Sequence, residues 1–310
     1  MSSTFGDPTL DEAFREQGFV VVDLFSPDEA DALLDEVRAL EPDDRFAPDG
    51  TGLNLSEYHC TFLDVSHAYK AASARLIEER FAERLRALLP AYRLLLSNLY
   101  VKQPGTGRFE VHQNWQTTAD LNDVTVTAWC PLVDTSPANG TICVVPRSHE
   151  LVPAIEAVST PKYYERFYDQ LVDHWLEPVS LRRGQCLLFD DTLLHWSDEN
   201  TSAEPRWAVQ IDLVPTTADP VVYWLNHDAD PPRFEVFAAD SSFYESADVT
   251  VLREGPRHLP RRGLRPYVDL RLSEEQFTYL MDRGPELRAR YFDGERIEDL
   301  FIEAMAAYGA

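Results

Sequence analysis

The chain has 310 residues, of which 44% are hydrophobic and 11% aromatic, so it can bury a sizeable core and is expected to be folded over most of its length. Its 53 acidic residues outnumber 28 basic ones, and the formal net charge of −25 argues against nucleic acid or an anionic membrane as the main partner. No segment approaches the roughly 18 consecutive apolar residues of a membrane span, and residues 1–10 lack the features of a secretory signal, so we expect a cytoplasmic protein.

The front of the chain is predicted to be mostly helical. We expect helices at residues 10–17, from Ser26 onward and at 68–89, with a buried strand at 18–24. The second helix has a clear start, because Ser26 can cap it, Pro27 suits the first helical position and Glu29 can complete a capping box.

From residue 94 onward, strands dominate the prediction. Apolar runs separated by Pro, Gly and Asn lie at residues 94–102, 124–134, 140–146, 185–194 and 206–214. A helical front followed by many strands without alternating helices favours an antiparallel barrel or sandwich with a helical layer. Residues 216–310 are mixed, with strand-like pieces, a basic loop at 253–265 and a helical end from Ser273.

Two histidines and an arginine form the most informative pattern. His112 lies where a strand begins, and residues i and i+2 of a strand share a face, so Glu110 and Asn114 are expected to point the same way as His112. His195 follows the predicted strand 185–194, and Arg206 opens the next strand. Histidines from separate strands and an interior arginine are the parts of a non-haem Fe(II) site that binds a 2-oxo acid through the arginine.

At these residues the sequence resembles the phytanoyl-CoA dioxygenase family of Fe(II)- and 2-oxoglutarate-dependent oxygenases. The resemblance is carried in chain order by residues 18–22, 102–105, 112–115, 128–134, 139–140, 145–149, 184–189 and 195–206. It spans about residues 10–215 and implies a mainly β, double-stranded β-helix (a jelly-roll barrel) with helical flanks. We expect one domain, 1–310, in which residues 216–310 are a C-terminal extension packed on the barrel.

The resemblance also implies the roles of site residues. His112 and His195 would bind the iron, Arg206 would anchor 2-oxoglutarate and Lys102 would lie near this co-substrate. Fe(II), 2-oxoglutarate and O2 are the implied cofactors. The family usually has glycine where this chain has Arg147.

One position of the metal motif departs from the family. The family's first motif is His-x-Asp, whereas this chain has Asn114 as the third residue, and a neutral amide oxygen is a weaker ligand than a carboxylate. Three outcomes follow, in order of preference. Asn114 ligates weakly and oxygenation proceeds; or the metal is lost and the protein is an inactive jelly-roll binding protein; or chloride takes the position, as in a halogenase. Glu110 is a further candidate ligand.

The preferred prediction is an enzyme that hydroxylates or desaturates a small organic molecule, with secondary metabolism as the suggested setting. A jelly-roll isomerase or lyase with another metal is a more distant alternative that would need neither oxygen nor 2-oxoglutarate. Trp115 and Trp129 are candidates to line the pocket, and residues 163–167 lie in an insertion that is either a substrate lid or a helix packed on the barrel. The sequence leaves the substrate and the oligomeric state open.

Overall fold

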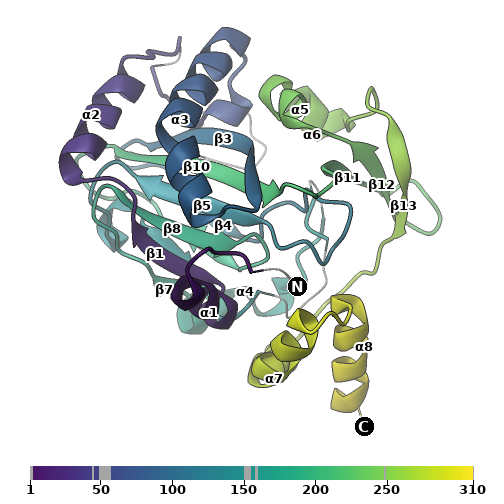
Figure 1. Ribbon diagram of the computed structural model, residues 1–310. Helices are drawn as coiled ribbons and strands as arrows, with labels where there is room; N and C mark the ends of the chain where they lie inside the picture. The colour runs from purple at the N-terminus through teal and green to yellow at the C-terminus, as the bar shows by residue number, and fades with distance from the viewer. Residues whose placement is uncertain are drawn as a thin grey trace.

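Two antiparallel sheets form the centre of the protein. The computed structural model describes residues 3–43, 45–48, 57–149, 155–157, 160–247 and 249–309. The larger sheet has the order β1 (Phe19–Asp23), β8 (Gln185–Asp190), β5 (Val126–Pro131), β10 (Arg206–Pro215), β3 (Tyr92–Lys102) and β2 (His59–Cys60) (Figure 1). The smaller sheet has the order β4 (Phe109–His112), β9 (His195–Ser197), β6 (Ile142–Val144) and β7 (Glu177–Pro178).

Side chains from both sheets meet in one buried cluster. Trp129 of β5, Phe189 of β8 and Ala208 of β10 come from the larger sheet, and Ile142 and Val144 of β6 come from the smaller one. Apolar burial of this kind joins two sheets face to face. The predicted mainly β jelly roll is confirmed.

The side chains of β10 alternate between two faces of the strand, one in the hydrophobic core and the other in a pocket. Val209, Ile211 and Leu213 belong to the cluster beneath the helices. Arg206 and Asp212 belong to the other set, which lines a pocket between the sheets. A period of two is what an extended strand imposes, so one strand contributes both a hydrophobic face and a polar, functional face.

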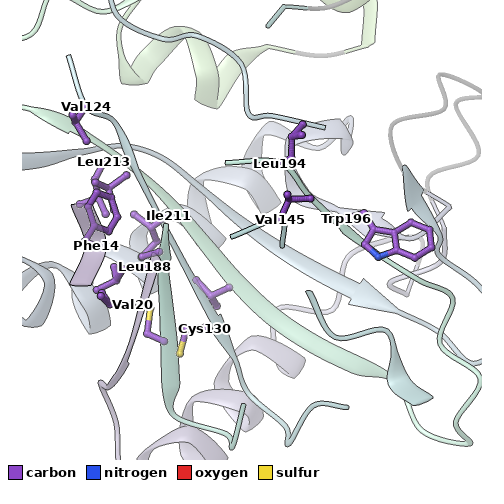
Figure 2. Packing of buried hydrophobic residues seen from close by; sticks show 14 of the residues in the cluster. Phe14, Val20, Val124, Cys130, Val145, Leu188, Leu194, Trp196, Ile211 and Leu213 are labelled. Carbon is purple, nitrogen blue, oxygen red and sulfur yellow. The ribbon is translucent and has the colours of Figure 1, made fainter. Parts of the chain in front are cut away.

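Helices cover the outer face of the larger sheet. They are α1 (Pro8–Gln17), α2 (Pro27–Arg38) and α3 (His67–Leu88), and α3 runs across β3 (Figure 1). Figure 2 shows Phe14 of α1 beside Ile211 and Leu213 of β10, within one buried cluster. The predicted capping box of α2 is present: the Glu29 amide donates to Ser26 Oγ at 3.3 Å, and the Ser26 amide donates to the Glu29 carboxylate at 2.8 Å.

Short helical turns occupy the connections. They are η1 (Thr61–Leu63), η2 (Pro137–Asn139), η3 (Glu165–Phe167), α4 (Tyr168–Gln170) and η4 (Leu171–Trp175). The last three belong to the insertion between β6 and β7, where Tyr163, Tyr164 and Phe167 are buried. These aromatic residues pack inward, and Tyr168 of the same insertion lines the pocket. The insertion therefore both packs on the barrel and contributes to the pocket wall.

The C-terminal part contains a small sheet and four helices. The strands are β11 (Val221–Asn226), β12 (Arg233–Ala238) and β13 (Arg261–Pro266), and the helices are α5 (Ser241–Ser246), α6 (Val249–Glu254), α7 (Glu274–Phe292) and α8 (Ile297–Tyr308). The predicted helical end is confirmed. The prediction of one basic loop at 253–265 was wrong at both ends, because residues 249–254 are helical and 261–266 form a strand. Arg261 and Arg262 pair with Glu235 and Asp219, so neighbouring acids offset their charge.

The helices α7 and α8 lie at one end of the molecule, away from the larger sheet (Figure 1). Phe277 of α7 contacts Phe167 and Trp175 of the insertion, with ring centroids 5.2 and 5.1 Å apart. That the whole chain is one domain stays a prediction. None of the helices in the described residues is long and apolar enough to cross a membrane.

Candidate metal centre

The two histidines predicted to bind metal lie side by side. His112 and His195 are directly opposite each other in the pairing of β4 with β9, and their ring centroids are 4.1 Å apart. Opposite residues of an antiparallel pair bring their side chains close together on the same face. Strand pairing thus joins two residues that are far apart in the sequence.

The path of the chain to His195 differs from the prediction. His195 does not end a strand that begins at Gln185, because β8 stops at Asp190 and β9 begins at His195 in the other sheet. Asp190 causes the break: its carboxylate accepts from the Thr192 amide at 2.8 Å and its carbonyl accepts from the Leu193 amide at 2.9 Å. This side-chain-to-backbone turn carries the chain from the larger to the smaller sheet and places His195 opposite His112.

Both imidazoles are held in the same way. His112 Nδ1 bonds to the Glu110 carbonyl and His195 Nδ1 to the Leu193 carbonyl, each at 2.8 Å. A carbonyl only accepts, so Nδ1 carries the hydrogen and Nε2 of the neutral ring keeps its lone pair for a metal. Burial lowers the pKa of His195 to about 4, and burial together with the neighbouring ring of His195 lowers the pKa of His112 well below its usual range. Both rings are therefore neutral near pH 7, as metal ligands must be.

Asn114 lines the same pocket just beyond the end of β4. Its Nδ2 donates to Thr127 Oγ1 at 2.7 Å and to Asp191 Oδ1 at 3.2 Å. These two bonds occupy the nitrogen, so Oδ1 is the amide atom that can be offered to a metal. The role of Asn114 as a ligand stays a prediction.

No carboxylate of the described residues takes the third position. Within this part of the chain, no three His, Cys, Asp or Glu side chains lie close enough to hold a metal ion together. Glu110, the alternative ligand, is exposed, and its carboxylate accepts a hydrogen bond from the Tyr168 hydroxyl. The donor set that remains is two imidazoles and the amide oxygen of Asn114.

Arg206 is a buried cation with no anion beside it among the residues that the structure describes. Its side chain lines the pocket and the residue is only 2% exposed. In the described part of the chain it forms no ion pair, and its Nε has no hydrogen-bond partner. The guanidinium lies 5.3 Å from the Trp129 ring, and burial lowers its pKa to about 10. An uncompensated buried charge is unfavourable, so this site suits an incoming carboxylate.

Lys102, the other residue predicted to lie near the co-substrate, is fully buried. Its ammonium donates to Ser197 Oγ at 2.8 Å, to the Ser197 carbonyl at 3.2 Å and to the Asp198 carbonyl at 2.6 Å. These bonds tie β3 to the end of β9. Its contact with a co-substrate stays a prediction.

A cavity of about 510 Å³ connects these groups. It is lined by both histidines, Asn114 and Arg206, and also by Trp115 and Trp129, the two tryptophans named as candidates. Its size lies within the range of sites for small organic ligands.

Two acidic residues in this pocket escaped the sequence analysis. Thr127 Oγ1 lies 2.6 Å from Asp191 Oδ1 and 3.3 Å from Asp212 Oδ1, which links the two carboxyl groups. Burial raises the pKa of Asp191, and it raises that of Asp212 to about 7 with a smaller effect from the Asp191 charge. The signal for Asp212 was present, since it shares the period-two face of β10 with Arg206. Asp191 lies on a turn, where no such periodicity applies.

Comparison with known proteins identifies a family and similar folds. The sequence profile of the phytanoyl-CoA dioxygenase (PhyH) family matches residues 14–208. The fold is similar to that of the non-haem α-ketoglutarate-dependent epimerase SnoN from nogalamycin biosynthesis, with 22% identity and a TM-score of 0.52 over 68% of this chain and 84% of that one. It is also similar to the carbocyclase SnoK from the same biosynthesis, with 18% identity and a TM-score of 0.53 over 69% and 86%. A search of curated proteins found no match.

The two structural similarities show a shared fold. The family match is stronger evidence, because residues 14–208 are more than half of the chain. The chain belongs to the phytanoyl-CoA dioxygenase family of non-haem iron, 2-oxoglutarate-dependent enzymes.

Proposed function

We propose that this protein is an Fe(II)- and 2-oxoglutarate-dependent oxygenase that hydroxylates or desaturates a small organic molecule. One observation carries the proposal: a buried arginine without a counter-ion among the described residues shares a pocket with two neutral imidazoles whose Nε2 atoms remain available. A role in secondary metabolism stays a prediction.

The residues present fit the cofactors. His112, His195 and the Asn114 amide oxygen would hold the ferrous ion, and Arg206 would hold the distal carboxylate of 2-oxoglutarate. When bound together, Fe(II) and 2-oxoglutarate would supply the electrons that reduce O2 and so activate it for attack on a C–H bond.

The protein's own contribution is binding and orientation. Arg206 can grip a carboxylate through two parallel hydrogen bonds, which fixes the direction of the co-substrate. The aromatic walls, which include Phe109, Trp115 and Trp129, leave apolar contact area for a substrate.

The first test is an anaerobic titration of metal-free protein with Fe(II) and 2-oxoglutarate, followed by the visible charge-transfer band of the chelate. We expect a band in wild type and none in His112→Ala or His195→Ala. No band and no stoichiometric iron in wild type would favour the inactive binding protein. A change of the spectrum with added chloride would favour the halogenase.

Arg206→Gln tests the co-substrate site separately. Loss of a charge-assisted hydrogen bond worth about 1.5–3 kcal/mol should weaken 2-oxoglutarate binding roughly 10- to 100-fold and leave Fe(II) binding unchanged. Arg182→Gln, at an exposed arginine outside the pocket, is the matched control and should change neither affinity. Equal 2-oxoglutarate affinity in Arg206→Gln and wild type would remove Arg206 as the anchor.

A further inference from the structure

We propose that Asp191 is a positioning residue that makes Asn114 a competent metal ligand: it fixes the amide with its oxygen available to the metal, and it supplies the negative charge that the amide lacks. The inference rests on the proposed function, because it concerns the same ferrous site. It explains how a two-histidine site can keep a metal after the loss of its carboxylate ligand.

Asn114 is attached to Asp191 at two points. Its backbone amide donates to the Asp191 carbonyl at 2.8 Å, and its side-chain Nδ2 donates to Asp191 Oδ1 at 3.2 Å. Thr127 completes the arrangement, since its hydroxyl donates to Asp191 Oδ1 at 2.6 Å and accepts from Asn114 Nδ2 at 2.7 Å. Three side chains thus form a closed ring of hydrogen bonds.

This ring determines the orientation of the amide. An ionised carboxylate only accepts hydrogen bonds, so the Asn114 atom that faces Asp191 must be the nitrogen. The Thr127 hydroxyl has one hydrogen, and giving it to Asp191 leaves only a lone pair for Asn114. Both neighbours therefore select Nδ2, and the carbonyl end of the amide is left for the metal.

The ring of hydrogen bonds also places the Asp191 carboxylate next to the proposed ligand Asn114. Asp191 is 4% exposed, and burial raises its pKa, but the hydrogen bonds that it accepts from Thr127 and Asn114 lower its pKa and so favour the ionised form within the ring. A carboxylate that accepts from a ligand's N–H increases the basicity of that ligand, as it does for metal-bound histidines. Asp191 cannot itself be the third ligand, because among the described residues no group of three acidic, histidine or cysteine side chains is close enough to share an ion.

A double-mutant cycle with Co(II) tests the proposal without turnover. Co(II) affinity and its visible spectrum are measured for wild type, Asp191→Asn, Asn114→Asp and the double variant. With the native Asn114, Asp191→Asn should lower Co(II) affinity roughly 10- to 100-fold. In the Asn114→Asp background the same change should lower it by less than about threefold, because the introduced carboxylate carries its own charge and accepts from the new amide at position 191.

Asp212→Asn is the matched control, because Asp212 contacts the same Thr127 hydroxyl, but in the described structure no hydrogen bond joins it to Asn114. We expect this variant to lose less than about threefold in Co(II) affinity. Equal losses of Co(II) affinity in Asp191→Asn and Asp212→Asn would show that any negative charge in the pocket has this effect. That result would overturn the proposal. The proposal would also be overturned if Asp191→Asn lowered Co(II) affinity equally with the native Asn114 and in the Asn114→Asp background, because a purely structural role of Asp191 predicts that result.

Thr127→Val provides a second variant if Asp191→Asn does not fold. It removes one acceptor of the Asn114 amide, and we expect weaker Co(II) binding with the native Asn114 only. Unchanged Co(II) binding in Thr127→Val would contradict the proposal. A wild type that binds no Co(II) at all would instead refute the proposed function, so the two failures are distinguishable.

Discussion

Local backbone geometry holds two of the three proposed ligands, while the third depends on distant residues. Each imidazole is fixed by the carbonyl two residues earlier in its own segment. The side chain of Asn114 instead takes its orientation from Thr127 and Asp191. Substitutions outside the ligand set should therefore affect the third ligand much more than the histidines.

Arg147 is a residue in an unfavourable backbone conformation. Its φ is +67°, a left-handed value that costs a residue with a Cβ atom about 1–2 kcal/mol, and the family resemblance places glycine here. Its side chain is exposed, and its amide donates to the Gln17 carbonyl at 2.9 Å, a bond that glycine would keep. We expect Arg147→Gly to raise the free energy of unfolding by about 1 kcal/mol in urea denaturation.

The control for this prediction is Arg147→Ala, which removes the guanidinium but keeps Cβ. It should be no more stable than wild type. If alanine stabilised the protein as much as glycine, the gain would come from the lost charge and not from the backbone.

At the scale of elements, features set by neighbours in the sequence were predictable. The capping box of α2 and the alternating faces of β10 follow from residues a few positions apart. The resemblance pointed to His112 and His195, and pairing of β4 with β9 brings these two residues together. Their role as metal ligands stays a prediction.

The break between β8 and β9 was not predicted, because the segment from Gln185 to Leu194 was interpreted as one strand although the polar residues Asp190, Asp191 and Thr192 interrupt its apolar run. The turn depends on a hydrogen bond of Asp190 to the backbone, which hydrophobic periodicity does not reveal. The contact of Asp191 with Asn114 is a further consequence of that turn. It joins residues 77 positions apart, so no local pattern could have indicated it.

Helix α7 supports the pocket wall from outside. Phe277 is fully buried against Phe167 and Trp175 of the insertion, and Tyr168 of the same insertion lines the pocket. Phe277→Ala should leave a cavity that weakens this contact by about 3–5 kcal/mol. We expect faster amide hydrogen exchange in residues 163–175 and 274–287, with exchange in β5 and β10 unchanged.

Ile302→Ala is the control for this substitution, because Ile302 of α8 is 64% exposed and its loss removes little buried surface. It should leave the exchange of the insertion as in wild type. Equal exchange of the insertion in Phe277→Ala and wild type would show that α7 does not support the wall.

For the molecule as a whole, the position of the acidic residues matters as much as their number. The net charge of −25 is carried mainly by the surface, but burial raises the pKa of several carboxyl groups, one of which is Asp191. Burial raises the pKa of Asp190, Asp212 and Glu156 to about 7 in each case. In the folded protein these three groups bind protons at pH values where exposed carboxylates are already ionised.

The sign of the resulting pH dependence follows from proton linkage. A carboxyl group with a folded pKa of about 7 and an unfolded value near 4 binds more protons in the folded state between these limits. Its stabilising contribution is complete below the unfolded pKa and is lost as the pH rises through 7. Carboxylates with a lowered pKa, such as Glu29, act only at lower pH, whereas His112 and His195, whose pKa values are lowered, oppose the trend of the carboxyl groups up to about the unfolded histidine pKa of 6.5.

We therefore expect the melting temperature of the metal-free protein to fall as the pH rises from 6 to 8, and to fall less steeply in Asp212→Asn. Asp219→Asn is the matched control, because Asp219 is half exposed and paired with Arg262 on the surface, and it should keep the wild-type slope. The control also separates titration from the general self-repulsion of an acidic chain, because Asp219→Asn removes one charge at every pH tested, whereas Asp212→Asn removes a charge only above the pKa of Asp212. If the two variants had the same slope, self-repulsion and not protonation of Asp212 would govern the pH dependence.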